Sequence, residues 1–566
     1  MSSMNALRNE QLTHLRAGVT FDVLVLGAGI NGAVSAAALA GHGARVALVD
    51  ARDFAAVTSQ ASSNLAWGGI KYLETLEFGL VSKLCRSRNG LMRAYPSTVR
   101  EIRFFANLDR GFRWPPVFLY LASLLYWAMG GFFTRAPRYL SPSRIAQDEP
   151  TVNNDRSVGG LEYSDAYLHD NDARFVFGFV RSALDHGATV ANYVRASHAR
   201  RGDDGLWRVE LVDTAPGADP TPFEVKARAV VNACGPWVDE RNASTGVETS
   251  HRHVFSKGIH LIVDRVSPHA RVLTFFADDG RMFFAIPMGR RTVIGTTDTR
   301  VDTPETVVTH EDRQFVLSNI NKRLRLAQPL TEADIIAERC GVRPLAVRGA
   351  RRGEAAHADW TKLSRKHAID VDTERAYLSI FGGKLTDCLN VGEEVCAHVA
   401  RLGIGLPART QWFGEPVKTI REAYFARARA LQIDTFTPPH GSEPLSERLW
   451  RRYGARAPGM IEKIGADPSA AQCVIEDAEY VRVELEEAAR SELVVRLEDF
   501  LRRRSKVSLV LRHSALAASP GVFAACQILF GPRAAEAWSE YFGGRCPWVD
   551  PEPEADPAPA AEAAAQ

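Results

Sequence analysis

One short segment near the amino terminus constrains the fold more than any other part of the sequence. Residues 21–26 read FDVLVL, residues 27–32 read GAGING, and an alanine-rich run then leads to a second apolar run at residues 45–50, RVALVD. A strand, a tight turn, a helix and a second strand form a βαβ unit. We therefore predict a Rossmann-like α/β domain at this end of the chain.

The turn between the first strand and the helix has the glycine spacing of a dinucleotide-binding site. Gly27 allows the tight turn, Gly29 lets the backbone approach a pyrophosphate, and Gly32 lets the helix pack closely on the strand. The helix N-terminus offers free N–H groups and partial positive charge to the phosphates. Asp50 follows about twenty residues later, where a carboxylate accepts ribose hydroxyls, which favours FAD or NAD over NADP. The motif alone does not choose between FAD and NAD.

The rest of the chain indicates further domains, because 566 residues are too many for one hydrophobic core. Residues 155–235 mix helical and strand-like patterns, short strand-like runs dominate residues 250–300, and residues 415–545 are helical in pattern. Residues 547–566 are mostly Pro, Ala, Glu and Asp, so we expect a disordered tail. Residues 1–20 lack an apolar core of the kind found in secretory signals, so no such signal is expected.

Charge and cysteine content argue against several classes of function. The 69 basic and 67 acidic residues leave a formal net charge of +2, so no global field points to nucleic acid. Recognition of an anion must therefore come from a local cluster. The eight cysteines form no CxxC pair and none stands at zinc-ligand spacing with histidine, so we expect free thiols and no metal site.

An uncharged stretch at residues 114–133, WPPVFLYLASLLYWAMGGFF, lies between Arg113 and Arg135. A membrane-spanning helix needs about 20 apolar residues, but prolines open this stretch and glycines close it, which leaves about 15. We expect a buried helix or a helix that dips into a membrane surface with its aromatic side chains at the interface. The sequence pattern leaves these two alternatives open.

A series of motifs, in matching order, resembles the FAD-dependent glycerol-3-phosphate dehydrogenases of the glycine oxidase/D-amino-acid oxidase superfamily. The segment GAGINGAVSAAALAGHGARVALVDARDFAAVTSQASSNLAWGGIKYLETLEF begins the series at Gly27. The later motifs are AVVNACGPWVDE (229–240), KGIHLIV (257–263), VIGTTDT (293–299), CGVRPL (340–345) and SIFGGKLTD (379–387). The C-terminal helical region, including LEDFLRRRSKV (497–507), resembles the family's cap domain.

This resemblance implies a mixed α/β fold in which a Rossmann-like FAD-binding domain is interleaved with a β-sheet substrate domain, followed by a C-terminal α-helical cap domain. The implied boundaries are an N-terminal extension (1–20), an oxidoreductase region (21–405), FAD-binding parts near 21–100, 150–245 and 350–405, a substrate-binding sheet near 246–350, and a helical domain (410–545).

Flavin, rather than nicotinamide, is favoured by two further segments. Residues 58–63, TSQASS, are either a polar loop with helix-capping serines or a run of donors along the flavin pyrophosphate and ribityl chain, and we favour the second. Residues 382–386, GGKLT, end a strand and open a helix whose N-terminus stabilises the anionic edge of a reduced flavin. Non-covalent FAD is expected to contact Gly27, Gly29, Gly32, Asp50, Thr58, Ser62, Ser63, Trp67, Gly68, Gly235, Gly383, Leu385 and Thr386.

Fixed cations are needed to bind a phosphorylated alcohol, because arginine forks onto phosphate oxygens and lysine acts as a point charge. By resemblance, Arg343 and Lys384 face the substrate beside the flavin, and Lys71, Tyr72 and Arg365 complete the substrate site. For Arg365 a surface position is an equal alternative.

His260 is the candidate general base, since imidazole titrates near neutrality and can take the hydroxyl proton while hydride leaves carbon. A structural histidine in an apolar strand is the competing interpretation. Arg343 is expected to stabilise the developing alkoxide. Two departures from the family pattern concern substrate recognition: Trp67 and Lys71 stand where better-studied members have histidine and arginine. A third departure is Asn64, which replaces a lysine.

The resemblance implies oxidation of sn-glycerol 3-phosphate to dihydroxyacetone phosphate by hydride transfer from C2 to flavin N5. Electrons then pass to membrane quinone from a cytoplasmic protein bound peripherally to the inner face of the membrane. An oxidase that uses oxygen, acting on this or another small anionic substrate such as an amine or hydroxy acid, is one alternative. A non-catalytic flavin-binding scaffold is another. A monomer and a homodimer both stay open.

Overall fold

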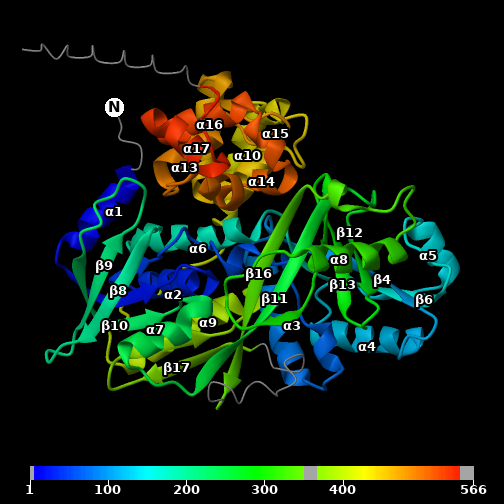
Figure 1. Ribbon diagram of the computed structural model, residues 1–566, viewed down its shortest axis with the longest axis horizontal. Coiled ribbons are helices and arrows are strands. Elements are labelled where there is room, and N and C mark those ends of the chain that lie inside the picture. Colours follow the sequence, from blue (N-terminus) through cyan, green and yellow to red (C-terminus); the bar gives the residue numbers. More distant parts are fainter. Residues whose placement is uncertain (1–5, 350–365, 549–566) are drawn as a thin grey trace, which may run out of the picture.

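The computed structural model describes residues 6–349 and 366–548 and contains two β-sheets with helices around them (Figure 1). In the first sheet the strands follow the order β17-β18-β10-β1-β2-β7, with β9 also on β10 and β8 on β9. The pairs β1–β2, β1–β10, β2–β7 and β10–β18 are parallel. The strands are β1 Thr20–Leu26, β2 Val46–Val49, β7 Thr189–Ala191, β8 Val194–Arg201, β9 Trp207–Asp213, β10 Phe223–Asn232, β17 Ala368–Asp372 and β18 Tyr377–Phe381.

The predicted βαβ unit is confirmed. Helix α2 (Ile30–Gly41) follows β1 and leads to β2, and its alanines are buried in the core that the sheet shares with α6 and α9. A Cβ atom added to Gly32 would lie 1.8 Å from the carbonyl oxygen of Gly27, so no larger residue fits where the helix crosses the turn. The other helices around the two sheets are α1 Ala6–Arg16, α3 Phe78–Ala94, α5 Pro142–Asp148, α6 Asp172–Asp185, α7 Val238–Thr245, α8 His310–Arg323 and α9 Cys388–Arg401.

The second sheet uses more of the chain than residues 246–350. Its order is β15-β11-β14-β13-β12-β4-β6-β3, with β16 on β11 and β5 on β6. Four strands from residues 65–168 join it because β12 pairs in parallel with β4, for example Arg271 with Arg103. The strands are β3 Leu65–Ala66, β4 Val99–Asp109, β5 Arg138–Leu140, β6 Ser157–Leu168, β11 His251–Asp264, β12 Arg271–Phe276, β13 Met282–Met288, β14 Arg291–Gly295, β15 Thr299–Val301 and β16 Ala337–Arg348.

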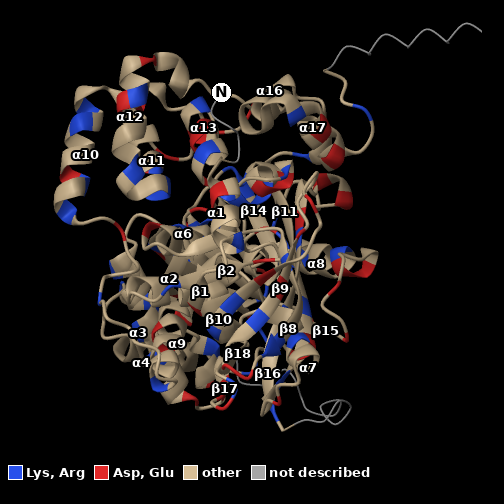
Figure 2. Ribbon diagram, turned by 90° about the vertical axis from the view of Figure 1, so that its left-hand side faces the viewer, with Lys and Arg blue, Asp and Glu red and all other residues tan. Residues whose placement is uncertain are grey.

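The C-terminal part is a separate helical layer that lies against one side of the sheet region (Figures 1 and 2). Buried ion pairs fasten it there. Arg504 donates to both oxygens of Asp53, each at 2.8 Å, and burial of this carboxyl is offset by Arg504 and Arg503, which lower its pKa. The helices are α10 Lys418–Ala430, α11 Leu445–Tyr453, α12 Ala457–Ala466, α13 Arg482–Ser491, α14 Val507–Val510, α15 His513–Ala517, α16 Pro520–Phe530 and α17 Ala534–Phe542, with a π-helical turn, η11, at Asp499–Arg504.

The uncharged stretch forms helix α4 (Pro116–Met129), on the side of the molecule opposite the helical layer (Figure 1). Only Ser123 and Tyr126 in this helix are buried. Phe118 and Leu121 are 50% and 57% exposed. Of the two alternatives left open by the sequence, the buried helix is therefore contradicted, because several large apolar side chains of α4 face outward. Within residues 6–349 and 366–548, no helix combines the length and the apolar character needed to cross a membrane. The predicted disordered tail falls outside the described residues from residue 549 onward.

Candidate active site

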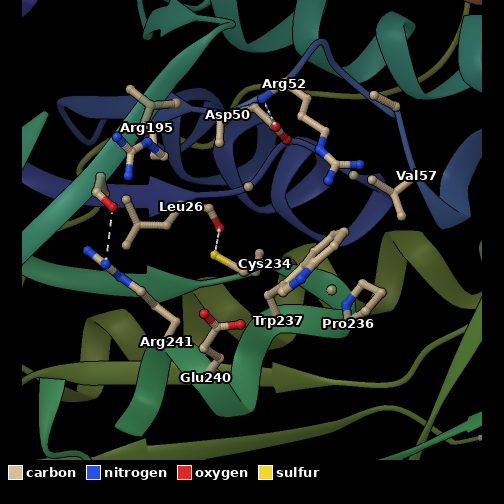
Figure 3. A pocket seen from close by; sticks show the side chains of 18 of the residues that line it. Leu26, Asp50, Arg52, Val57, Arg195, Cys234, Pro236, Trp237, Glu240 and Arg241 are labelled. Carbon is tan, nitrogen blue, oxygen red and sulfur yellow. Dashed lines mark hydrogen bonds between the residues drawn. The ribbon is translucent and has the colours of Figure 1, made fainter. Parts of the chain in front are cut away.

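The glycine turn opens into a cavity of about 600 Å³ at the carboxyl ends of β1 and β2. Gly27, Gly29 and Asp50 line it from one side, and Gly235 lines it from the short η3 turn (Gly235–Trp237) that follows β10. Ligands of open parallel sheets bind at this edge of the strands. Figure 3 shows the side chain of Arg52 beside the indole of Trp237, with 5.0 Å between its guanidinium carbon and the ring centroid.

Asp50 is held by the backbone around the turn. Its carboxylate accepts from the amide of Ala28 at 2.6 Å and from the amide of Arg52 at 2.8 Å. Burial raises the pKa of Asp50 from 3.8 to about 6, against the lowering effect of those two amide donors. The group is therefore an anchored acceptor at the wall of the cavity, as a ribose-binding acid must be.

A second cavity of about 310 Å³ adjoins the first, since Thr58 and Ser59 line both. It lies between the loop after β2, the middle of β11, the middle of β16 and the turn after β18. Predicted site residues supply much of its wall: Thr58, Ser62, Ser63, Trp67, Tyr72, His260, Arg343, Gly383, Lys384, Leu385 and Thr386.

The two cavities together suit an extended dinucleotide with a flat ring at one end. A Cβ atom on Gly29 would lie 3.2 Å from the hydroxyl of Ser59, which itself accepts from the amide of Ile30 at the start of α2. At the other end Gly382 and Gly383 have φ angles of 62° and 108°, a backbone conformation that favours glycine. At both ends, glycines let the backbone come close to a ligand, and α9 starts just beyond the second glycine turn. These are the features expected for a site that binds FAD.

His260 is buried on β11, and its Nε2 lies 2.8 Å from the hydroxyl of Ser63. Its Nδ1 has no hydrogen-bond partner among the residues that the structure describes. Burial, and then the positive charges of Arg339 and Arg343, hold its pKa well below 6.5. The imidazole is thus neutral at neutral pH, the state a proton acceptor requires.

Both predicted cations line the second cavity. Arg343 on β16 donates to the hydroxyl of Thr296 at 2.8 Å and pairs with Asp298 at 3.3 Å, so the VIGTTDT motif fixes its guanidinium. Lys384 donates to the hydroxyl of Tyr72 at 2.7 Å, and its Nζ lies 4.1 Å from the centroid of that ring. An anion between them would meet two oriented charges.

Other predicted residues lie elsewhere. Lys71 is exposed and is not part of the lining of either cavity. Gly68 is buried behind the wall, where a Cβ atom would lie 2.1 Å from the Tyr126 hydroxyl. Gly32 packs on Gly27 and lines neither cavity. Arg365 lies outside the described residues.

Several lining residues were not predicted. Ser59 joins the two cavities, and its place inside the TSQASS run was the available signal. Lys366 adds a third cation to the second cavity. Arg52, Arg241 and Trp237 line the first cavity, and no local pattern distinguishes them from surface residues.

Comparison with known proteins gives a consistent picture. Residues 22–365 match the family described as FAD dependent oxidoreductase, and residues 420–536 match the C-terminal domain of alpha-glycerophosphate oxidase. Glycerol-3-phosphate dehydrogenase 2 of Mycobacterium tuberculosis is 32% identical over 87% of this chain and 82% of its own length. The aerobic glycerol-3-phosphate dehydrogenase of Escherichia coli is 30% identical over 87% of this chain and 95% of its own.

Among solved structures, the glycerol-3-phosphate dehydrogenase from Bacillus halodurans complexed with FAD matches with a TM-score of 0.67 at 22% identity, covering 95% of this chain and 94% of that chain. Glycine oxidase from Geobacillus kaustophilus matches over 68% of this chain and 95% of its own with a TM-score of 0.51 at 20% identity. Both likenesses concern the fold, and the first extends through the helical layer.

Proposed function

Because the chain belongs to the FAD-dependent oxidoreductase family, and within it to the glycerol-3-phosphate dehydrogenases, we propose that it oxidises sn-glycerol 3-phosphate to dihydroxyacetone phosphate. The observation that carries this proposal is the convergence of a neutral buried histidine and two oriented cations on one cavity that continues into the dinucleotide cleft. In this reaction the substrate alcohol loses a hydride from carbon and a proton from oxygen. No residue has to remove a proton from carbon.

His260 accepts the hydroxyl proton in this proposal. Its buried, neutral imidazole is a base throughout the neutral range, and the contact with Ser63 holds the ring in one orientation. FAD, when bound, supplies the acceptor for the hydride from C2. Removal of both the proton and the hydride leaves the ketone, so atoms and electrons balance.

Arg343 and Lys384 bind the anionic parts of the reaction. Arg343 is anchored on two sides by Thr296 and Asp298, so its guanidinium is suited to stabilise the developing alkoxide. Lys384 and Lys366 supply point charges for a phosphate. Lys71, which the family resemblance pointed to, contributes less in this arrangement because it lines neither cavity.

An anaerobic substrate panel tests the proposal. The purified holoprotein is mixed without oxygen with sn-glycerol 3-phosphate, glycerol, glycine or L-lactate, and bleaching of the flavin absorbance is recorded. We expect bleaching by the phosphorylated alcohol at far lower concentration than by glycerol. Bleaching by the amine or hydroxy acid alone would contradict the substrate assignment, and reduction by none of them would favour a non-catalytic flavin protein.

The electron acceptor in this proposal is a membrane quinone, with the protein bound peripherally to the inner face of the membrane. Support comes from helix α4, which has no charged residue and exposes Val117, Phe118, Leu121 and Leu125 together. Steady-state turnover with a short-chain quinone, set against peroxide formation in air, separates this acceptor from oxygen. Peroxide formed at the full rate of turnover would assign an oxidase instead.

A further inference from the structure

The wall of the second cavity is partly a loop with little regular structure. Residues 65–73 run from the two-residue strand β3 into the η2 turn (Ile70–Leu73), and Leu65, Trp67 and Tyr72 from this loop line the cavity. Tyr72 contacts Lys384 through its hydroxyl and its ring. The position of this loop therefore sets the position of a predicted substrate cation.

A buried carboxylate holds the loop from behind. Asp165 on β6 has no exposed surface, and its Oδ1 accepts from the amide of Gly68 at 3.0 Å. Arg88 on α3 donates to the same oxygen at 3.1 Å. A Cβ atom on Gly68 would clash with the Tyr126 hydroxyl at 2.1 Å, so this glycine serves the contact behind the cavity wall rather than close approach to a flavin ring.

Tyr126 completes the cluster from helix α4. Its hydroxyl donates to Asp165 Oδ2 at 2.7 Å and accepts from Arg88 at 3.3 Å. Burial, and then the charge of Asp165, raise the pKa of Tyr126, so the phenol keeps the proton that it donates. Tyr126 and Ser123 are the buried residues of a helix that exposes Val117, Phe118, Leu121 and Leu125 on its other face.

On the cavity side, the same loop is hydrogen-bonded to the turn that follows β18. The carbonyl oxygen of Trp67 accepts from the hydroxyl of Thr386 at 3.3 Å. A continuous path of hydrogen bonds thus joins α4 to Asp165, then to the loop at Trp67 and Gly68, and then to the turn after β18. Arg88 closes the cluster by contacting both of its other side chains.

We propose that Asp165 and Tyr126 are positioning residues for the reaction: they hold the loop 65–73 so that Tyr72 and Lys384 are oriented toward the substrate. This inference rests on the proposed function, because only that function assigns Lys384 to an anionic substrate. Neither residue lines the cavity, and the loop contains Trp67 and Lys71, two of the positions at which this chain departs from the family pattern.

Tyr126→Phe is the principal test, since it removes one hydroxyl and keeps the buried ring. Tyr120→Phe on the same helix is the matched control, because its ring only packs at an edge against Tyr139. The measurements are flavin content, thermal unfolding, the visible circular dichroism of bound flavin, and kcat and KM for sn-glycerol 3-phosphate. We expect an altered flavin spectrum and a KM about tenfold higher with kcat within about twofold, at full flavin content.

Asp165→Asn provides a second variant that keeps the shape of the side chain and removes its charge. We expect it to change the flavin spectrum and KM in the same direction as Tyr126→Phe. If Tyr126→Phe matches Tyr120→Phe in both spectrum and KM, the inference is overturned. The flavin spectrum needs no substrate, so a wild-type protein that fails to oxidise sn-glycerol 3-phosphate would refute the proposed function and leave this readout intact.

Discussion

The hydroxyl of Ser63 lies 2.8 Å from Nε2 of His260. This contact joins the loop after β2, which lines the dinucleotide cleft, to the middle of β11 in the second sheet. It orients a buried histidine that also lies near the charges of Arg339 and Arg343, and Nδ1 has no hydrogen-bond partner in the described part of the chain. The proton acceptor is therefore linked directly to the loop that lines the cofactor cleft.

His260→Asn is expected to lower the rate of anaerobic flavin reduction by about 100-fold or more, because removal of a general base costs that much. Stopped-flow reduction by sn-glycerol 3-phosphate measures the rate. His398→Asn on α9, a residue outside both cavities, is the control. A His260→Asn variant that reduces its flavin at the wild-type rate would assign the histidine a structural role only.

The pH dependence of that rate follows from the depressed pKa of His260. The folded protein binds this proton less readily than the unfolded chain, so the stability due to this group is complete above 6.5 and is lost as pH falls below that value. The base also stays neutral there. We expect the acid limb of the pH profile of kcat/KM to lie below pH 6.5, the ordinary pKa of imidazole. An acid limb centred at or above that pH would be inconsistent with the burial of this ring.

Lys384→Met is expected to raise KM for sn-glycerol 3-phosphate by about tenfold to 100-fold, since a hydrogen bond to a charged group is worth roughly 1.5–3 kcal/mol. Lys71→Met removes the same charge from an exposed position, and we expect a change within about twofold. Initial rates over a range of substrate concentrations give both values. The reverse order of effects would mean that the substrate approaches from the Lys71 side.

Asp50→Asn is expected to weaken FAD binding to the apoprotein by roughly 30-fold, because the amide keeps one acceptor but loses the charge. Quenching of flavin fluorescence gives the affinity. In the wild type this affinity should rise as pH increases through about 6, where Asp50 ionises. The group's contribution to apoprotein stability runs the other way, falling between pH 3.8 and about 6. If the affinity for FAD does not change with pH in this range, Asp50 does not bind the ribose.

Leu121→Glu together with Phe118→Glu is expected to reduce sedimentation with phosphatidylglycerol vesicles by about tenfold, because both side chains project from the apolar face of α4. Anaerobic flavin reduction by substrate should be unchanged. Val417→Glu is the control, since this residue is 65% exposed but precedes α10 in the helical layer. Equal sedimentation of all three proteins would show that α4 is not the membrane-binding surface.

Local patterns predicted the dinucleotide end of the site well. The strand, turn, helix and second strand between Thr20 and Val49 depend on residues that are neighbours in sequence, and the spacing of their glycines has a direct steric cause. The same holds for β18 (Tyr377–Phe381), the strand that was predicted to end at the GGKLT segment. In each case the feature that determines the structure lies within the segment itself.

Features that depend on distant partners could not be predicted in this way. The second sheet takes β4 because it pairs with the distant strand β12, for example Arg103 with Arg271, and takes β6 because β6 pairs with β4. Gly68 was expected to contact FAD, but a Cβ atom there would meet the hydroxyl of Tyr126 behind the cavity wall. Lys71 and Lys366 look alike in sequence, and only the tertiary arrangement decides which one lines a cavity.

The order of strands in the first sheet also bears on how the protein acquires its flavin during synthesis. Strand β1 pairs with β10, and β10 pairs with β18, so the glycine turn at Gly27 meets its counterpart at Gly383 only when most of the chain has left the ribosome. A nascent chain that ends before β18 has one half of the cleft. A complete cleft for the prosthetic group therefore exists only after the last strand has been translated.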